Sequence, residues 1–255
     1  MKVAIFSTCV VDLMFPEVGK AMVEVLERFG CDCYLPGDQI CCGQPTYNSG
    51  YSKATQKVFH NEIDALLSID ADYIVGPAGS CVAMLREYPE LLKDDPEYAD
   101  KAREVAAKSY EFSQFLWRIL GVENAGAELN AKATYHRSCH MTRLLGESEA
   151  PYALLDHVKG LEMIPLENAH DCCGFGGTFS AKEPEMSQLM VTEKVRHIVD
   201  TGAEVLVSCD MGCLMNIGGR FNREGKKIKI MHLAEVLNSN VDESRITYLK
   251  HAPVK

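Results

Sequence analysis

Two short stretches, Cys41-Cys42-Gly43 and Cys172-Cys173-Gly174, decide how this sequence is organised. Each pair of adjacent cysteines stands at the same place in a longer cysteine pattern, and that pattern occurs twice. The other members of the pattern are the upstream Cys9 and Cys139 and the downstream Cys81, Cys209 and Cys213. The spacing of the two sets is nearly the same, with 31 residues between the first pair and its upstream cysteine and 32 in the second set. We interpret the chain as a duplication built around groups that bind sulfur ligands.

The segments between the cysteines also repeat. Residues 3–9 align with residues 133–139, and each segment has the character of a strand that carries a cysteine at its carboxyl end. Apolar residues at spacings of three and four predict helices in both halves, at 19–29, 52–68 and 112–120 and at 151–158, 183–200 and 232–237. Further strands are expected at 33–36 and 71–75 and at 163–166 and 203–207.

Strands that alternate with longer helices are typical of βαβ units. The predicted fold class is therefore α/β, with two pseudo-symmetric tandem βαβ-type domains that contain parallel sheets. We place the first domain at 1–125 and the second at 126–255, because the apolar periodicity breaks down between residues 121 and 132. Residues 93–108 have no counterpart in the second half and are predicted to form an exposed helix. Ligands collect at the carboxyl ends of parallel strands, so the cysteines that follow these strands are expected to converge.

The composition is typical of a cytoplasmic globular protein. The apolar run at residues 1–6 is too short for a signal peptide, and no stretch approaches the roughly 20 apolar residues that span a bilayer. Eleven cysteines, an odd number, favour metal ligands or redox groups over a disulfide scaffold in a reducing compartment. The formal net charge of −10 disfavours nucleic acid and anionic membranes as partners.

The cysteine spacing favours an inorganic cluster over a single ion. Thiolates select zinc, copper(I) or iron, and structural zinc ligands typically lie two to four residues apart, whereas adjacent side chains diverge. We expect an iron–sulfur cluster in the second half and an iron–sulfur cluster or zinc in the first. The second half has five candidate ligands and the first has four, because Pro77 stands where the other half has its additional cysteine. The candidate ligands are Cys139, Cys172, Cys173, Cys209 and Cys213 in the second half and Cys9, Cys41, Cys42 and Cys81 in the first.

Over essentially its whole length the sequence resembles the cysteine-rich CCG family. This family includes the cysteine-rich component of heterodisulfide reductase, the iron–sulfur subunit of glycolate oxidase and the lactate utilization protein A group, and the length and the two CCG units resemble the last of these most. The motifs that carry the resemblance are the repeated cysteine pattern, Gly43-Gln44-Pro45, 171–177 and 208–215. In heterodisulfide reductase such domains hold a non-cubane 4Fe-4S cluster with five cysteine ligands, which matches the second half better than the first.

The resemblance implies an iron–sulfur redox subunit of a multi-protein system that oxidises L-lactate to pyruvate. The expected partners are a ferredoxin-type iron–sulfur protein and a third subunit of a lactate utilization complex, with a small hydroxyacid as a possible substrate. Two alternatives stay open: a thiol–disulfide redox protein similar to heterodisulfide reductase, and a structural metal-binding scaffold subunit. The sequence identifies no catalytic acid or base.

Three histidines and two arginines near the cysteines are weaker candidates. His140 and His170, and to a lesser degree His136, are candidates for handling a proton beside a cluster. Arg137 and Arg143 are candidates for holding a carboxylate, because arginine forms two parallel hydrogen bonds with it, although surface ion pairs are the simpler interpretation. Asp210 is expected to cap a turn, and Cys31 and Cys33 are interpreted as packing residues.

Overall fold

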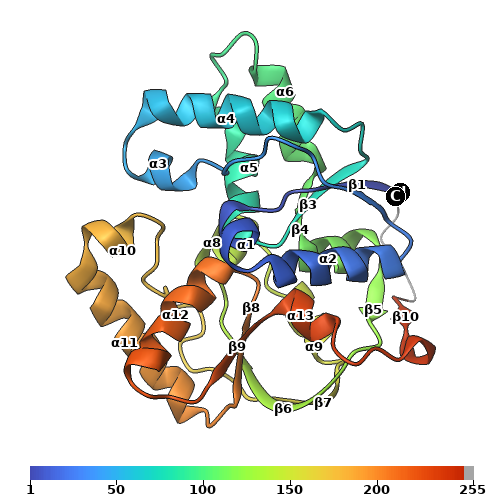
Figure 1. The fold of residues 1–255 in the computed structure, drawn as a ribbon, viewed down its shortest axis with the longest axis vertical. Coiled ribbons are helices and arrows are strands. Elements are labelled where there is room, and N and C mark those ends of the chain that lie inside the picture. The colour runs from blue at the N-terminus through green and yellow to red at the C-terminus, as the bar shows by residue number, and fades with distance from the viewer. Residues whose placement is uncertain (250–255) are drawn as a thin grey trace.

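The computed structural model describes residues 1–249, and residues 250–255, at the end of the predicted second domain, lie outside the described residues. Two four-stranded parallel sheets form the framework (Figure 1). The first has the order β2-β1-β3-β4, with β1 (Lys2–Ile5), β2 (Asp32–Tyr34), β3 (Tyr73–Gly76) and β4 (Ser109–Glu111). The second has the order β7-β6-β8-β9, with β6 (Glu128–Tyr135), β7 (Lys159–Met163), β8 (Val205–Ser208) and β9 (Lys229–His232). The two sheets therefore have the same topology, and the predicted α/β duplication with parallel sheets is confirmed.

Helices follow the strands in a similar order in both halves, with one additional helix between the third and fourth strands of the first half. In the first half they are α1 (Cys9–Met14), α2 (Pro16–Arg28), α3 (Gln44–Asn48), α4 (Ser52–Leu67), α5 (Gly79–Leu91), α6 (Ala99–Lys108), α7 (Phe112–Gln114) and the π-helical turn η1 (Phe115–Ile119). In the second half they are α8 (Cys139–Arg143), α9 (Ala150–Leu155), α10 (Phe179–Lys182), α11 (Pro184–Asp200), α12 (Met211–Arg223), α13 (Leu233–Leu237) and the 3-10 turn η2 (Glu243–Arg245). A two-stranded antiparallel ribbon joins β5 (Val122–Asn124) to β10 (Thr247–Tyr248).

Several elements differ from the sequence-based expectation. The long helices α5 and α12, which begin two residues before Cys81 and Cys213, were not anticipated. Leu214, Ile217 and Phe221 are buried along α12, and their spacing of three and four is the pattern that could have indicated this helix. The exposed helix expected at 93–108 is confined to α6, whose Ala102 and Val105 are buried.

The segment at 121–132 is also more ordered than the sequence pattern suggested, because it contains β5 and the first half of β6. The helix expected at 112–120 is divided into α7 and the π-helical turn η1. The boundary at residues 125 and 126 stays a prediction.

A central apolar core joins the two halves. It contains residues of β1, such as Val3 and Ile5, together with residues of β8 and α13, such as Val205 and Leu233. Helix α2 lies against α13 in this region (Figure 1), and Arg28 of α2 donates a hydrogen bond to the carbonyl oxygen of Leu237. Two further apolar clusters, one mainly in each half, lie outside this shared core.

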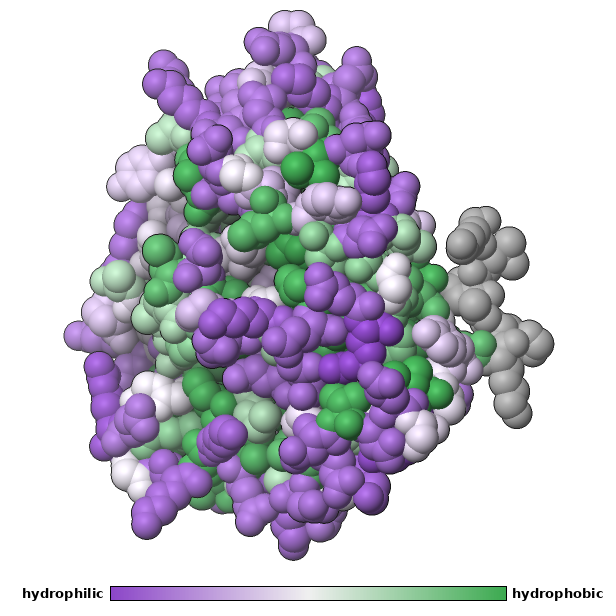
Figure 2. Space-filling model, turned by 45° about the vertical axis from the view of Figure 1, so that its right-hand side comes forward, coloured by the Kyte–Doolittle hydropathy of each residue, from purple (hydrophilic) through white to green (hydrophobic). Residues whose placement is uncertain are grey.

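The surface of the molecule is mixed in character. On the face shown in Figure 2, hydrophobic residues occur in small groups between hydrophilic ones. None of the helices within residues 1–249 combines the length and the apolar character needed to cross a lipid bilayer.

Glu111 and His232 occupy equivalent positions at the ends of β4 and β9, where each caps the helix that follows. The Nδ1 of His232 accepts a hydrogen bond from the Ala234 amide, and its Nε2 therefore donates to the carbonyl oxygen of Pro77 at 2.7 Å. Glu111 accepts hydrogen bonds from the Ser113 and Gln114 amides. Burial raises the pKa of the Glu111 carboxyl to about 7 in spite of these donors.

The raised pKa of Glu111 predicts a pH-dependent loss of stability. A glutamate in an unfolded chain has a pKa of about 4.3, so between roughly pH 4.5 and 7 the folded protein binds more protons at this group than the unfolded chain does. The free energy of unfolding should therefore fall as pH rises through this window. Relative to Glu111→Gln, the wild type should lose about 1 to 3 kcal/mol, measured by urea denaturation at a series of pH values.

The matched control for this prediction is Glu90→Gln, because Glu90 lies on the surface. This variant should keep the pH profile of the wild type. Parallel profiles for the wild type and Glu111→Gln would show that Glu111 is ionised in the folded protein over the whole range.

Candidate metal centre

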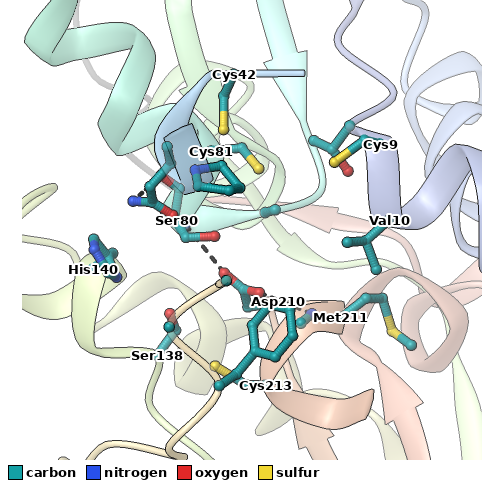
Figure 3. A pocket seen from close by; sticks show the side chains of 18 of the residues that line it. Cys9, Val10, Cys42, Ser80, Cys81, Ser138, His140, Asp210, Met211 and Cys213 are labelled. Atoms are coloured by element: carbon teal, nitrogen blue, oxygen red, sulfur yellow. Dashed lines mark hydrogen bonds between the residues drawn. The ribbon is translucent and has the colours of Figure 1, made fainter. Parts of the chain in front are cut away.

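Eight of the nine cysteines predicted as ligands line one cavity between the two halves (Figure 3). They follow strand ends or begin helices at the same edge of each sheet, because parallel strands deliver their carboxyl ends together. In Figure 3, Cys9, Cys42 and Cys81 lie on one side of the cavity, and Cys213 lies on the other. The two sets, which we call the first and second quartets, are Cys9, Cys41, Cys42 and Cys81, and Cys139, Cys172, Cys173 and Cys213.

The thiols of the first quartet contact one another in sequence order. The sulfur atoms of Cys9 and Cys41 are 3.7 Å apart, and Cys42 contacts both Cys41 and Cys81. Hydrogen bonds from Cys42 and Cys9, together with the amide of Gly43, hold the pKa of the Cys41 thiol well below its usual range. One member of the quartet is thus prepared to be a thiolate, which is the form that binds metal.

The second quartet repeats this arrangement. Cys139 and Cys173 both contact Cys172, and Cys173 also contacts Cys213. Hydrogen bonds from Cys139 and Cys173, with the Gly174 amide at 3.4 Å from the Cys172 sulfur, lower the pKa of Cys172 strongly. The chain of contacts between thiols is therefore the same in both halves.

The glycine after each cysteine pair has the backbone conformation that this arrangement requires. Gly43 and Gly174 have φ angles of 81° and 80°, in the left-handed region that disfavours side chains. A Cβ atom on Gly43 would lie 2.5 Å from the Phe59 ring, and one on Gly174 would lie 2.8 Å from the carbonyl oxygen of Ser187. The absence of a side chain lets the turn pack against α4 or α11 while its amide points at sulfur.

Cys209 is separated from the other eight candidate ligands. Side chains alternate along a strand, and Cys209 continues the inward face of Val205 and Val207 into the central core. Its sulfur accepts a hydrogen bond from the Tyr135 hydroxyl at 3.3 Å and lies 3.9 Å from the Ser113 hydroxyl. It does not line the cavity, so the structure gathers four cysteines in the second half where the sequence suggested five. The alternation of β8 was visible in the sequence and could have indicated this.

The three candidate histidines differ in their positions. The Nδ1 of His140 is 3.4 Å from the Cys139 sulfur, at the cavity wall. His170 is exposed and lies 3.7 Å from the Asp171 carboxylate. His136, which the sequence favoured least, is fully buried, and neither ring nitrogen has a hydrogen-bond partner in the part of the chain described. Burial, with the nearby Lys194 ammonium, lowers the pKa of His136 to about 3, so the ring is neutral.

The candidate arginines do not line the cavity. Arg137 packs over the Tyr152 ring, and Arg143 donates a hydrogen bond to the carbonyl oxygen of His170. The predicted capping role of Asp210 is confirmed: its carboxylate accepts from the Gly212 amide at the start of α12 and from the Ser80 amide in the other half.

The residues around each quartet fit a thiolate-bound metal centre. Eight sulfur donors suit iron–sulfur clusters or zinc. At the equivalent positions Thr8 and Ser138, directly before α1 and α8, the hydroxyls are buried and have no partner within residues 1–249. Buried hydroxyls are normally hydrogen-bonded, and metal-bound sulfur beside them would accept hydrogen bonds from them.

Comparison with known proteins identifies the repeat. The cysteine-rich CCG domain matches residues 3–86 and 133–218. Lactate utilization protein A from Geobacillus thermodenitrificans is 57% identical over 93% of this chain and 99% of its own length. The protein of the same name from Bacillus subtilis is 55% identical over 94% of this chain and 100% of its own.

A crystal structure of a hypothetical protein from Helicobacter pylori has a related fold. It superposes on 96% of this chain with a TM-score of 0.63 at 11% sequence identity, and the matched region is 50% of that chain. The likeness supports the architecture of the duplicated α/β body.

Replacing Gly174 with alanine should destabilise the protein much more than the same change at Gly202. Both glycines have positive φ angles, but a Cβ atom on Gly202 would meet nothing within 4 Å. Gly202→Ala should cost about 1 kcal/mol for the left-handed backbone, and Gly174→Ala at least twice that because it also meets the Ser187 carbonyl. Urea denaturation would measure both, and equal losses would show that the turn relaxes without cost.

Proposed function

The chain belongs to the cysteine-rich CCG family, in the lactate utilization protein A group, and from that premise we propose that it is the iron–sulfur subunit of a cytoplasmic system that oxidises L-lactate to pyruvate. The observation that carries the proposal is the pair of matched thiol quartets on one cavity. The names of the relatives connect such a chain to lactate utilization.

We propose that each quartet holds a 4Fe-4S cluster. Four cysteines are the usual ligand number for such clusters, and the two quartets present the same donors in the same order. A bound cluster takes up and releases single electrons. The five-cysteine non-cubane form implied by the family resemblance would need the Cys209 sulfur, which is turned into the core.

The chain's own residues prepare and shield these centres. Cys41 and Cys172 are the thiols most easily ionised, while the buried Cys42 and Cys173 keep one side of each quartet away from water. The contact between Asp210 and the Ser80 amide fixes the distance between the halves. A shared cavity of this kind suits electron transfer between two centres.

We assign electron transfer rather than substrate dehydrogenation to this chain. Within the described residues, no arginine or lysine is among those that line the cavity, so a lactate carboxylate has no guanidinium or ammonium partner there. A ferredoxin-type iron–sulfur protein and a third subunit are the partners that would exchange electrons with it and act on the hydroxyacid.

Substituting one cysteine of a quartet should remove about half of the bound iron. Cys42→Ser and Cys173→Ser each take one sulfur from a different quartet, so each should lose one of two clusters while the fold survives. Iron and sulfide analysis of anaerobically purified protein, with circular dichroism as a check on folding, would measure this loss. A wild-type preparation that binds only zinc would overturn the proposal.

Cys209→Ser is the matched test of the ligand number. A serine hydroxyl keeps a partner for Tyr135, so the variant should retain the full iron content and the wild-type EPR spectrum. Loss of one cluster with the fold intact would mean that Cys209 is a ligand.

Lactate should reduce the clusters only when the partner subunits are present. The purified wild-type chain, mixed with the proposed partners, should show lactate-dependent bleaching of its visible absorption, and Cys173→Ser should slow this bleaching at least tenfold. Turnover of a disulfide substrate without any response to lactate would instead indicate a thiol–disulfide redox protein. Activity that follows thermal stability alone across the cysteine variants would indicate a scaffold.

A further inference from the structure

His136 is a buried polar side chain whose ring makes no hydrogen bond within residues 1–249. It follows directly after β6 and has no exposed surface. A neutral imidazole offers one N–H donor and one acceptor nitrogen, yet neither finds a partner among residues 1–249. Because buried polar groups are nearly always paired, an isolated imidazole at this place points to a partner that the polypeptide does not supply.

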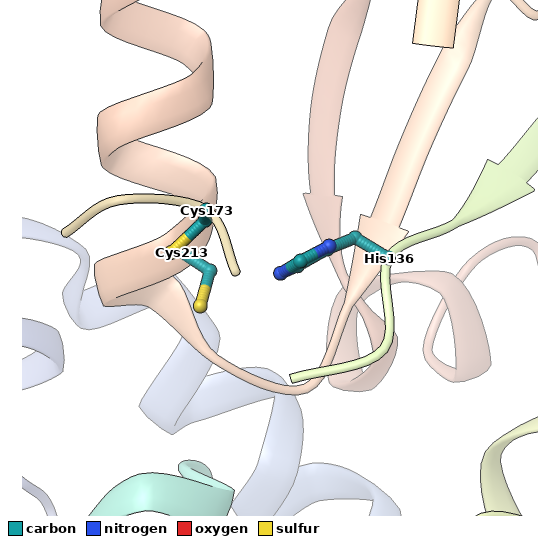
Figure 4. A group of neighbouring side chains, drawn as sticks. All are labelled: His136, Cys173 and Cys213. Atoms are coloured by element: carbon teal, nitrogen blue, oxygen red, sulfur yellow. The ribbon is translucent and has the colours of Figure 1, made fainter. Parts of the chain in front are cut away.

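The His136 ring is directed at the second quartet. One ring nitrogen and the sulfur atoms of Cys173 and Cys213 all lie within 4.8 Å of one another, and Figure 4 shows the ring pointing towards the two sulfurs. Nitrogen and sulfur ligands of one metal ion, at about 2.0 to 2.3 Å from it, lie roughly 3.5 Å apart. Small side-chain movements would therefore bring the three donors onto a common ion.

The first quartet has no counterpart of this nitrogen. The alignment of Cys9 with Cys139 places Phe6 opposite His136, and Phe6 is buried against Gly76. The fold thus accepts a phenyl ring at this position, and packing alone does not call for an imidazole.

We propose that a ring nitrogen of His136 is a ligand of the metal centre in the second quartet, in addition to its four thiolates. This inference rests on the proposed function for the presence of the centre, and it makes the two centres chemically unequal. A neutral imidazole adds a nitrogen donor to the second centre without adding negative charge.

The test compares His136→Phe with His140→Phe in protein purified anaerobically after growth on isotopically labelled histidine. Pulsed EPR of the reduced wild type should show a strongly coupled histidine nitrogen. His136→Phe should lose this coupling and keep its iron and sulfide. His140→Phe should keep the coupling, because His140 contacts Cys139 only from the cavity wall.

Three results would overturn the proposal: no strong nitrogen coupling in iron-loaded wild type, a coupling that survives His136→Phe, or one that disappears in His140→Phe. A weak coupling typical of a hydrogen-bonded nitrogen counts as the first of these. If His136→Phe does not fold, His136→Gln should lose the strong coupling in the same way.

A second arm separates this proposal from the proposed function. If the wild type binds no iron, the iron–sulfur role fails, and cobalt(II) is then added to metal-free wild type and His136→Phe. Visible absorption bands that shift between the two proteins would support nitrogen ligation at the second quartet. Identical spectra would overturn it.

Discussion

The contact between two helix-initiating turns, one from each half, holds the thiol quartets face to face. The Ser80 amide donates to the Asp210 carboxylate, and the Gly79 amide lies 3.4 Å from the carbonyl oxygen of Cys209. A Cβ atom on Gly79 would lie 2.9 Å from the Cβ atom of Met141 on α8 of the second half, so the close approach depends on glycine. This contact brings the cysteine-bearing edges of the two sheets together at the wall of the common cavity.

A duplicated fold does not make its two sites equivalent. Glu62 of α4 and Lys194 of α11 occupy corresponding positions, and both are buried. The Glu62 carboxylate accepts hydrogen bonds from the Ile40 and Cys41 amides, whereas the Lys194 ammonium donates to the carbonyl oxygen of Asn168. A buried anion beside the first quartet and a buried cation beside the second favour a more negative charge on the second centre.

Much of the fold and of the site could be predicted from the cysteine pattern. Repeated strand, helix and cysteine spacing is a local property, and it identified the duplication, the parallel sheets and eight of the residues that meet at the cavity. The direction of Cys209 depends on which face of β8 is buried in the central core, and that core is shared between halves. The sequence favoured His136 least of the three histidines. Residue spacing does not show that a buried side chain lacks a hydrogen-bond partner, which only the structure reveals.

The Cys209 side chain lies in the central core between the halves and does not line the cavity. Its sulfur meets the Tyr135 hydroxyl and lies near Ser113 and Glu111, in the core between the halves. At the equivalent place in the first half, the Pro77 carbonyl accepts a hydrogen bond from His232. Both positions thus join the halves, one through a thiol and the other through a backbone carbonyl. The Cys209 sulfur is turned into this core between the halves. In our proposal, the fifth donor of the second centre therefore comes from another element, namely His136 directly after β6.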